Sequence, residues 1–174
     1  TVLAFLSVYC KVIPDMWYAN SFSVANLLCG TGAIWQAHAG HPVRAFVLVF
    51  IGQVFDLFDG RLARKFGSTP HGALFDDVAD GTSFGLAITY LVWRQLGDEF
   101  GLTGLLVALV YLACVIYRLI RFLKPTIRLP PGIFQGLPSP AGAMLAGAAA
   151  LALADWPELG LGVVLLSSYL MISN

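Results

Sequence analysis

Apolar residues are concentrated in six long stretches of the chain, and most of its prolines lie in the segments between them. A helix needs about 20 mostly apolar residues to cross the hydrocarbon core of a membrane. The six stretches cover approximately residues 22–40, 43–64, 72–93, 102–122, 139–154 and 159–172. The pattern therefore predicts an all-α integral membrane protein with six transmembrane helices.

The segment before the first stretch has a different character. Residues 1–18 mix apolar side chains with Lys11, Pro14 and Asp15. This mixture predicts an interfacial segment that lies on the membrane, with an additional span as the alternative. No tandem repeat or low-complexity linker divides the remainder, so we expect an N-terminal interfacial segment over residues 1–21 and one transmembrane domain over residues 22–174.

The composition favours lipid as the surrounding solvent. Hydrophobic residues make up 58% of the 174 residues, charged residues make up 11%, and the mean hydropathy is +0.79. A soluble domain is usually about 25% charged, so a water-exposed surface would be hard to build from this chain. The formal net charge of zero gives no reason to expect nucleic acid as a partner.

The basic residues indicate an orientation. Lysine and arginine are enriched in the cytoplasmic segments of membrane proteins. With a cytoplasmic N-terminus and six spans, all but two of the ten basic residues fall on the cytoplasmic side, and the exceptions are Arg44 and Arg94. We therefore expect a multi-pass protein of the plasma or inner membrane whose second helix ends, and whose third begins, at the cytoplasmic face.

Half of the acidic residues of the chain lie around that junction. Asp56 and Asp59 are three residues apart near the end of the second stretch, and Asp76 and Asp80 are four residues apart near the start of the third. Each spacing places both carboxylates on one face of a helix. The segment between the pairs contains Gly67 and Pro70, which predicts a turn that lets the two faces meet.

Charged side chains within a membrane are costly, and facing carboxylates also repel one another. Divalent cations would remove both difficulties, and oxygen ligands suit Mg²⁺, Mn²⁺ or Ca²⁺ better than zinc. A structural network with Arg61, Arg64 and Lys65 is the alternative. A cation or proton transporter is another, but transport predicts acidic groups at several membrane depths, whereas these four cluster at one end. A noncatalytic lipid-binding scaffold would not require four convergent acids.

Small residues and a cation accompany the acidic pairs. Gly60 follows Asp59 directly, and Ala63 comes three residues later, so a flat ligand could approach the helix backbone there. Arg64 lies one turn beyond Gly60, and a guanidinium beside a metal site is suited to phosphate oxygens. Helix packing and membrane-interface anchoring are the simpler roles for these residues.

Taken together, these residues resemble the signature of the CDP-alcohol phosphotransferases. The matching segments are Asp56-Leu-Phe-Asp59-Gly60-Arg-Leu-Ala63-Arg64 and Gly72-Ala-Leu-Phe-Asp76-Asp-Val-Ala-Asp80. The number of residues between Arg64 and Gly72 is one fewer than is usual in the family, which shortens the turn but leaves both helical faces intact.

Further segments resemble the branch of that family whose acceptor alcohol is L-serine. Departures from the branch pattern occur at Ala19, Asp77 and Ile120, and they affect the choice of acceptor more than the chemistry. The segments that match are Asn20-Ser-Phe-Ser23-Val-Ala-Asn26, Ser83-Phe-Gly85, Arg118-Leu-Ile-Arg121-Phe122, Gly136-Leu-Pro-Ser-Pro-Ala141 and Leu170-Met-Ile-Ser173.

The resemblance implies an enzyme that transfers a phosphatidyl group from CDP-diacylglycerol to the serine hydroxyl and releases CMP. It implies two Mg²⁺ or Mn²⁺ ions per site, a homodimer, and contact with membrane lipids. Glycerol phosphate, inositol phosphate and choline stay open as other acceptors. The implied ligands of the ions are Asp56, Asp59, Asp76 and Asp80.

The resemblance also implies roles for the remaining site residues. Asp80 would be the catalytic base in addition to its contact with one ion. Arg118 and Arg121 would bind the serine carboxylate or a lipid phosphate, unless they only anchor the helix at the membrane surface. The residues expected to bind CDP-diacylglycerol are Asn26, Gly60, Ala63, Arg64 and Gly72.

Overall fold

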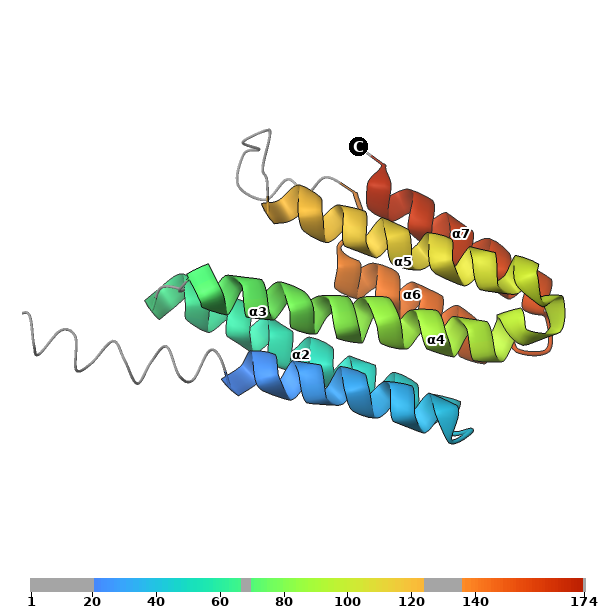
Figure 1. Cartoon of the computed structure of the whole chain (residues 1–174), viewed down its shortest axis with the longest axis horizontal. Coiled ribbons are helices and arrows are strands. Elements are labelled where there is room, and N and C mark those ends of the chain that lie inside the picture. The colour runs from blue at the N-terminus through green and yellow to red at the C-terminus, as the bar shows by residue number, and fades with distance from the viewer. Residues whose placement is uncertain (1–20, 67–69, 124–135, 174) are drawn as a thin grey trace, which may run out of the picture.

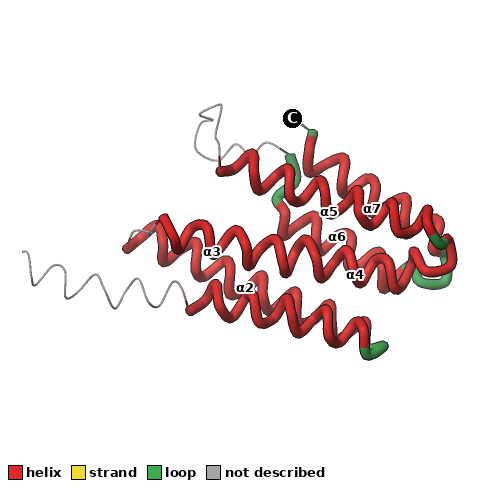
Figure 2. Tube along the Cα trace, viewed as in Figure 1, coloured by secondary structure: helices red, strands yellow, loops and turns green. Residues whose placement is uncertain are grey.

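The computed structural model describes residues 21–66, 70–123 and 136–173, and these parts of the chain form a bundle of long helices (Figure 1). Figure 2 shows that the described residues form helices and turns, without a strand among them. The first helix, called the N-terminal helix below, covers residues 21–38. The predicted interfacial segment and most of the predicted loop after residue 123 lie outside the described residues.

The order of the later elements follows the predicted order of the apolar stretches. Helix α2 covers Pro42–Phe66, α5 covers Leu102–Leu123, α6 covers Ser139–Ala152 and α7 covers Pro157–Ile172. Between α2 and α5 the backbone stays helical through α3 (Pro70–Asp80), the π-helix η1 (Gly81–Ala87), α4 (Ile88–Val92), the π-helix η2 (Trp93–Gly97) and the 3-10 turn η3 (Asp98–Phe100).

The structure confirms a helix for each of the six predicted stretches, and it lengthens the third. That helix was expected to end near Trp93, but it continues to Phe100. Arg94 and Asp98, which are four residues apart, form an exposed ion pair with 3.3 Å between Nη1 and Oδ2. The run of apolar side chains ends near Trp93, but the backbone remains helical for almost two more turns.

One helix among the described residues meets a test of length and apolarity for crossing a membrane. It covers Leu102–Arg121 within α5, with a mean hydropathy of 2.1. Helices α6 and α7 are apolar but shorter, with 14 and 16 residues. An all-α fold is therefore established for the described residues, and six crossings stay a prediction.

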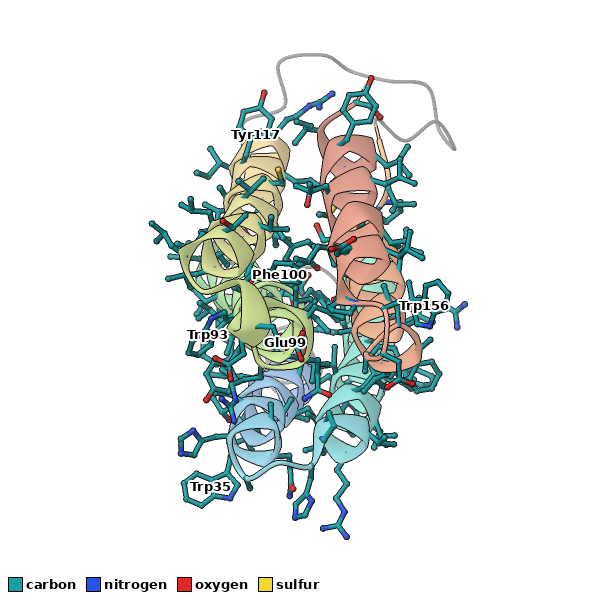
Figure 3. All side chains as sticks on the ribbon, turned by 90° about the vertical axis from the view of Figure 1, so that its right-hand side faces the viewer. Trp35, Trp93, Glu99, Phe100, Tyr117 and Trp156 are labelled. Carbon is teal, nitrogen blue, oxygen red and sulfur yellow. The ribbon has the colours of Figure 1, made fainter. Side chains whose placement is uncertain are left out.

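The long helix from Pro70 to Phe100 occupies the centre of the bundle. Its η1 and α4 segments contact α2, α5 and α6, and α7 packs against α5 and α6. Phe84, Ile88 and Leu91 of this helix are fully buried. Large apolar side chains also cover the outside of the bundle, and in Figure 3 Trp35, Tyr117 and Trp156 point away from it.

Glycines allow neighbouring helices to approach each other closely. A Cβ at Gly30 would lie 2.8 Å from the Cα of Ser83, and one at Gly52 would lie 2.8 Å from Oδ1 of Asn26. Real Cβ atoms do not tolerate such distances. The N-terminal helix is therefore held tightly against both α2 and the central helix, at the level of the acidic residues.

The contact between Gly97 and Gly104 gives a stability prediction. A Cβ at Gly104 would lie 2.6 Å from the carbonyl carbon of Gly97, and this backbone cannot move aside as a side chain can. We expect Gly104→Ala to lower the free energy of unfolding by about 1–3 kcal/mol, the usual cost of overpacking. The matched control is Gly162→Ala in α7, where a Cβ meets nothing within 4 Å. Thermal unfolding in detergent checks the pair, and equal midpoints would contradict the prediction.

Candidate active site

The two acidic pairs meet where α2 ends and α3 begins, at the end of the bundle to which α5 also runs (Figure 1). One carboxylate oxygen from each of Asp56, Asp76 and Asp80 lies within 4.8 Å of the other two. All three side chains are partly buried. The predicted convergence of the two helical faces is therefore present for these three residues.

Asp59 is more deeply buried than the other three. Its side chain is only 5% exposed and accepts a hydrogen bond from Oγ of Ser23. The same hydroxyl lies 3.2 Å from Oδ1 of Asp76. Since a hydroxyl has one proton, it can serve only one of the two carboxylates at a time. Ser23 thus links the N-terminal helix to both acidic pairs.

Asn26 approaches the cluster from the same face of the N-terminal helix. Its Nδ2 donates a hydrogen bond of 2.9 Å to Oδ1 of Asp80. Its backbone carbonyl accepts a hydrogen bond of 2.8 Å from Oγ of Ser83, in the π-helix that follows Asp80. The Asn26 side chain is fully buried, and its Oδ1 has no hydrogen-bond partner.

The donor set fits a hard divalent cation. Three carboxylates from two helices converge, and oxygen is the ligand that Mg²⁺ and Mn²⁺ prefer. Arg61, whose side chain is exposed, forms no ion pair with these carboxylates within the described part of the chain. The alternative of a structural network with Arg61 therefore finds no support, while the side chains of Arg64 and Lys65 lie outside the described part.

Four of the five residues expected to bind the donor lie in the same two helices as the acidic residues. A Cβ at Gly60 would meet no described atom within 4 Å, so within the described part of the chain no other helix packs against the backbone of α2 there. Ala63 and Arg64 follow in the last turns of α2, and Gly72 lies in the first turn of α3.

Arg118 and Arg121 lie near the end of α5, at the same end of the bundle as the acidic pairs. Leu119 packs against Gly81, the residue after Asp80, at 3.6 Å from where a Cβ would lie. Arg118 is 6% exposed, and it donates from Nε to the Leu137 carbonyl at 2.8 Å and from Nη1 to Oγ of Ser139 at 3.3 Å. These bonds attach the start of α6 to α5.

Two residues of the site were not among the predicted site residues. Ser23 contacts the acidic pairs directly, and Ser83 contacts Asn26. A signal for both is present in the sequence, because Ser23 lies three residues before Asn26 and Ser83 lies three residues after Asp80. Polar residues at this spacing on otherwise apolar helices share a face with the neighbouring site residue.

Residues 16–173 match the CDP-alcohol phosphatidyltransferase family. This match covers most of the chain, and the chain belongs to that family. Phosphatidyl transfer is accordingly its class of reaction.

Several relatives have the same described activity. The chain is 31% identical over 169 residues to a CDP-diacylglycerol–serine O-phosphatidyltransferase of Helicobacter pylori, which covers 92% of this chain and 71% of the relative. It is 32% identical over 123 residues to an enzyme of the same name from Bacillus subtilis, and the match covers 70% of this chain and 68% of the relative. With an enzyme of the same name from Methanocaldococcus jannaschii the identity is 35% over 104 residues, and the match covers 59% of this chain and 48% of the relative. The chain therefore spans between about half and seven tenths of the length of these relatives.

Proposed function

We propose that the protein transfers the phosphatidyl group of CDP-diacylglycerol to the hydroxyl of L-serine, forming phosphatidylserine and releasing CMP. The observation that carries the proposal is the convergence of carboxylate oxygens from Asp56, Asp76 and Asp80, on two different helices, at one place in the bundle. A diphosphate substrate with divalent cations is complementary to such a site. Relatives described as serine phosphatidyltransferases support serine as the acceptor.

The proposal includes a membrane setting in which all six helices cross the bilayer and the site opens at the cytoplasmic face. Large apolar side chains on the outside of the bundle support it, including Val47, Phe50 and Leu57 of α2. The lipid tails of the donor could then stay in the bilayer while its nucleotide reaches the polar end of the helices. We also propose a homodimer in the plasma or inner membrane.

Asp56, Asp76 and Asp80 would hold Mg²⁺ or Mn²⁺, and Asp59 would join them as a ligand of a second ion. Bound divalent cations would neutralise the diphosphate and stabilise the charge on the departing CMP. Asn26, Gly60, Ala63, Arg64 and Gly72 would form the site for CDP-diacylglycerol. The open backbone at Gly60 lets the nucleotide lie directly against α2.

In the reaction, the serine hydroxyl oxygen forms a bond to the phosphorus that bears diacylglycerol, and the bond from this phosphorus to the CMP oxygen breaks. Asp80 accepts the hydroxyl proton, because a serine hydroxyl is a poor nucleophile at neutral pH without a positioned base. Arg118 and Arg121, near the end of α5, would attract the serine carboxylate.

A single assay tests the proposed function and its alternatives. Purified protein is incubated with CDP-diacylglycerol and one alcohol at a time, with CMP release measured with and without Mg²⁺ or Mn²⁺. We expect release with L-serine that requires the cation. Release with glycerol phosphate, inositol phosphate or choline would keep the chemistry and change the acceptor. No release with any alcohol would contradict the function itself.

The arginines give a prediction about the acceptor. We expect Arg121→Ala to raise the KM for serine about tenfold or more while changing that for CDP-diacylglycerol less, because a charge-assisted bond contributes roughly 1.5–3 kcal/mol. We expect Arg118→Ala to have the same effect, together with a lower unfolding temperature because its bonds to Leu137 and Ser139 are lost. Steady-state kinetics and thermal unfolding check both variants. An unchanged serine KM in both would leave these arginines with purely structural roles.

A further inference from the structure

The hydroxyl of Ser83 is fully buried and lies in the first turn of the π-helix η1, three residues after Asp80. It donates to the backbone carbonyl of Asn26, on a helix 57 residues earlier in the sequence. Asn26 in turn donates from its side chain to Oδ1 of Asp80. Asp80 and Ser83 therefore hold the same residue at two points, one through its side chain and one through its backbone.

Two further contacts fix this arrangement in place. Gly30, one turn after Asn26, lies so close to Ser83 that a Cβ there would be 2.8 Å from the Ser83 Cα. On the opposite side, the hydroxyl of Tyr111 in α5 donates to the carbonyl of Phe84 at 2.9 Å, and both residues are buried. The π-helix is thus held between two neighbouring helices, and π-helical turns occur frequently at functional sites.

We propose that Ser83 is a positioning residue, which fixes Asn26 and through it the orientation of the Asp80 carboxylate. The inference rests on the proposed function, in which Asp80 contacts an ion and accepts the proton of the acceptor hydroxyl. The bond from Asn26 to Oδ1 holds the Asp80 carboxylate in one orientation and leaves the remaining lone pairs of its two oxygens for these tasks. A carboxylate that rotates away from this orientation serves the reaction less well.

The experiment compares Ser83→Ala with Ser167→Ala. Ser167 is also fully buried and also donates from its hydroxyl to a backbone carbonyl of another helix, that of Gly142, at 3.1 Å. It belongs to the contact between α7 and α6, and it therefore controls for the loss of one buried interhelical hydrogen bond. Both variants are measured in the full chain for kcat, for Mn²⁺ affinity and for thermal midpoint.

We expect Ser83→Ala to lower kcat about 10- to 100-fold and to weaken Mn²⁺ binding by up to about tenfold, the scale of losing a group that orients a metal ligand. Ser167→Ala should lower the thermal midpoint to a similar degree and leave kcat and Mn²⁺ affinity unchanged. If Ser83→Ala changes only the thermal midpoint, the Ser83 hydroxyl contributes only to stability and the inference is wrong.

A double variant tests whether Ser83 acts through Asn26. Asn26→Ala removes the bond to Asp80, so adding Ser83→Ala should lower kcat far less than it does in the wild-type protein, because coupled residues are not additive. Additive losses would overturn the inference. If the wild-type protein releases no CMP with any alcohol, the proposed function fails, and Mn²⁺ affinity then decides the role of Ser83 by the same comparison.

Discussion

Asp56→Asn and Asp76→Asn are each expected to reduce CMP release by at least about 10³-fold, the scale on which charge-stabilising groups act in phosphoryl transfer. One oxygen from each carboxylate lies in the three-residue cluster, and the two residues come from different helices. Asparagine keeps the shape of the side chain but removes its charge, so the cluster as a whole attracts a divalent cation less strongly. Mn²⁺ binding should therefore weaken together with turnover.

The matched control is Asp77→Asn. Asp77 is adjacent to Asp76 in α3 and is also partly buried, but it does not belong to the cluster. It is the next residue of the same helix and loses the same charge, so a general effect of removing an acid would appear in this variant too. We expect near-normal CMP release and Mn²⁺ affinity from it. Near-normal release from Asp56→Asn or Asp76→Asn would instead remove the metal site from the mechanism.

The helices of the fold could be predicted because apolar length and proline positions mark them. Helices α2, α6 and α7 begin at or next to prolines, and Gly40, Gly101 and Gly136 adopt positive φ in the turns, where glycine is favoured. The end of the third helix could not be predicted in this way. The apolar pattern shows only where the side chains change from apolar to polar. The helical backbone continues beyond that point to Phe100.

The acidic site could be predicted in part from spacing alone. Residues three and four apart share a helix face, so each pair of aspartates had to point the same way. The spacing could not show that Asp59 accepts a bond from Ser23 outside the group of three, since this depends on the packing of the N-terminal helix. The bonds of Asn26 to Asp80 and of Ser83 to Asn26 join residues 54 and 57 positions apart, and no local pattern encodes them.

Asp80→Asn is expected to separate catalysis from donor binding. Asp80 lies one helical turn beyond Asp76, so its carboxylate can contact an ion at the cluster and still face an incoming hydroxyl. The amide of asparagine is nearly the same size, but it cannot accept the serine proton at neutral pH. It can still offer an oxygen to the ion. We therefore expect turnover to fall about 10²- to 10⁴-fold, the usual contribution of a general base, while affinity for CDP-diacylglycerol falls much less.

Calorimetry of CDP-diacylglycerol binding, combined with single-turnover measurement of CMP release, distinguishes the two roles of Asp80. If Asp80 were only a ligand of the ion, donor affinity and turnover would decrease together. A variant that binds the donor poorly but converts the bound donor at the wild-type rate would rule out the role of base. The hydrogen bond from Asn26 to Oδ1 keeps the side chain in place in the wild-type protein. In Asp80→Asn, the asparagine oxygen can accept the same bond, so the variant removes the proton acceptor and retains its position.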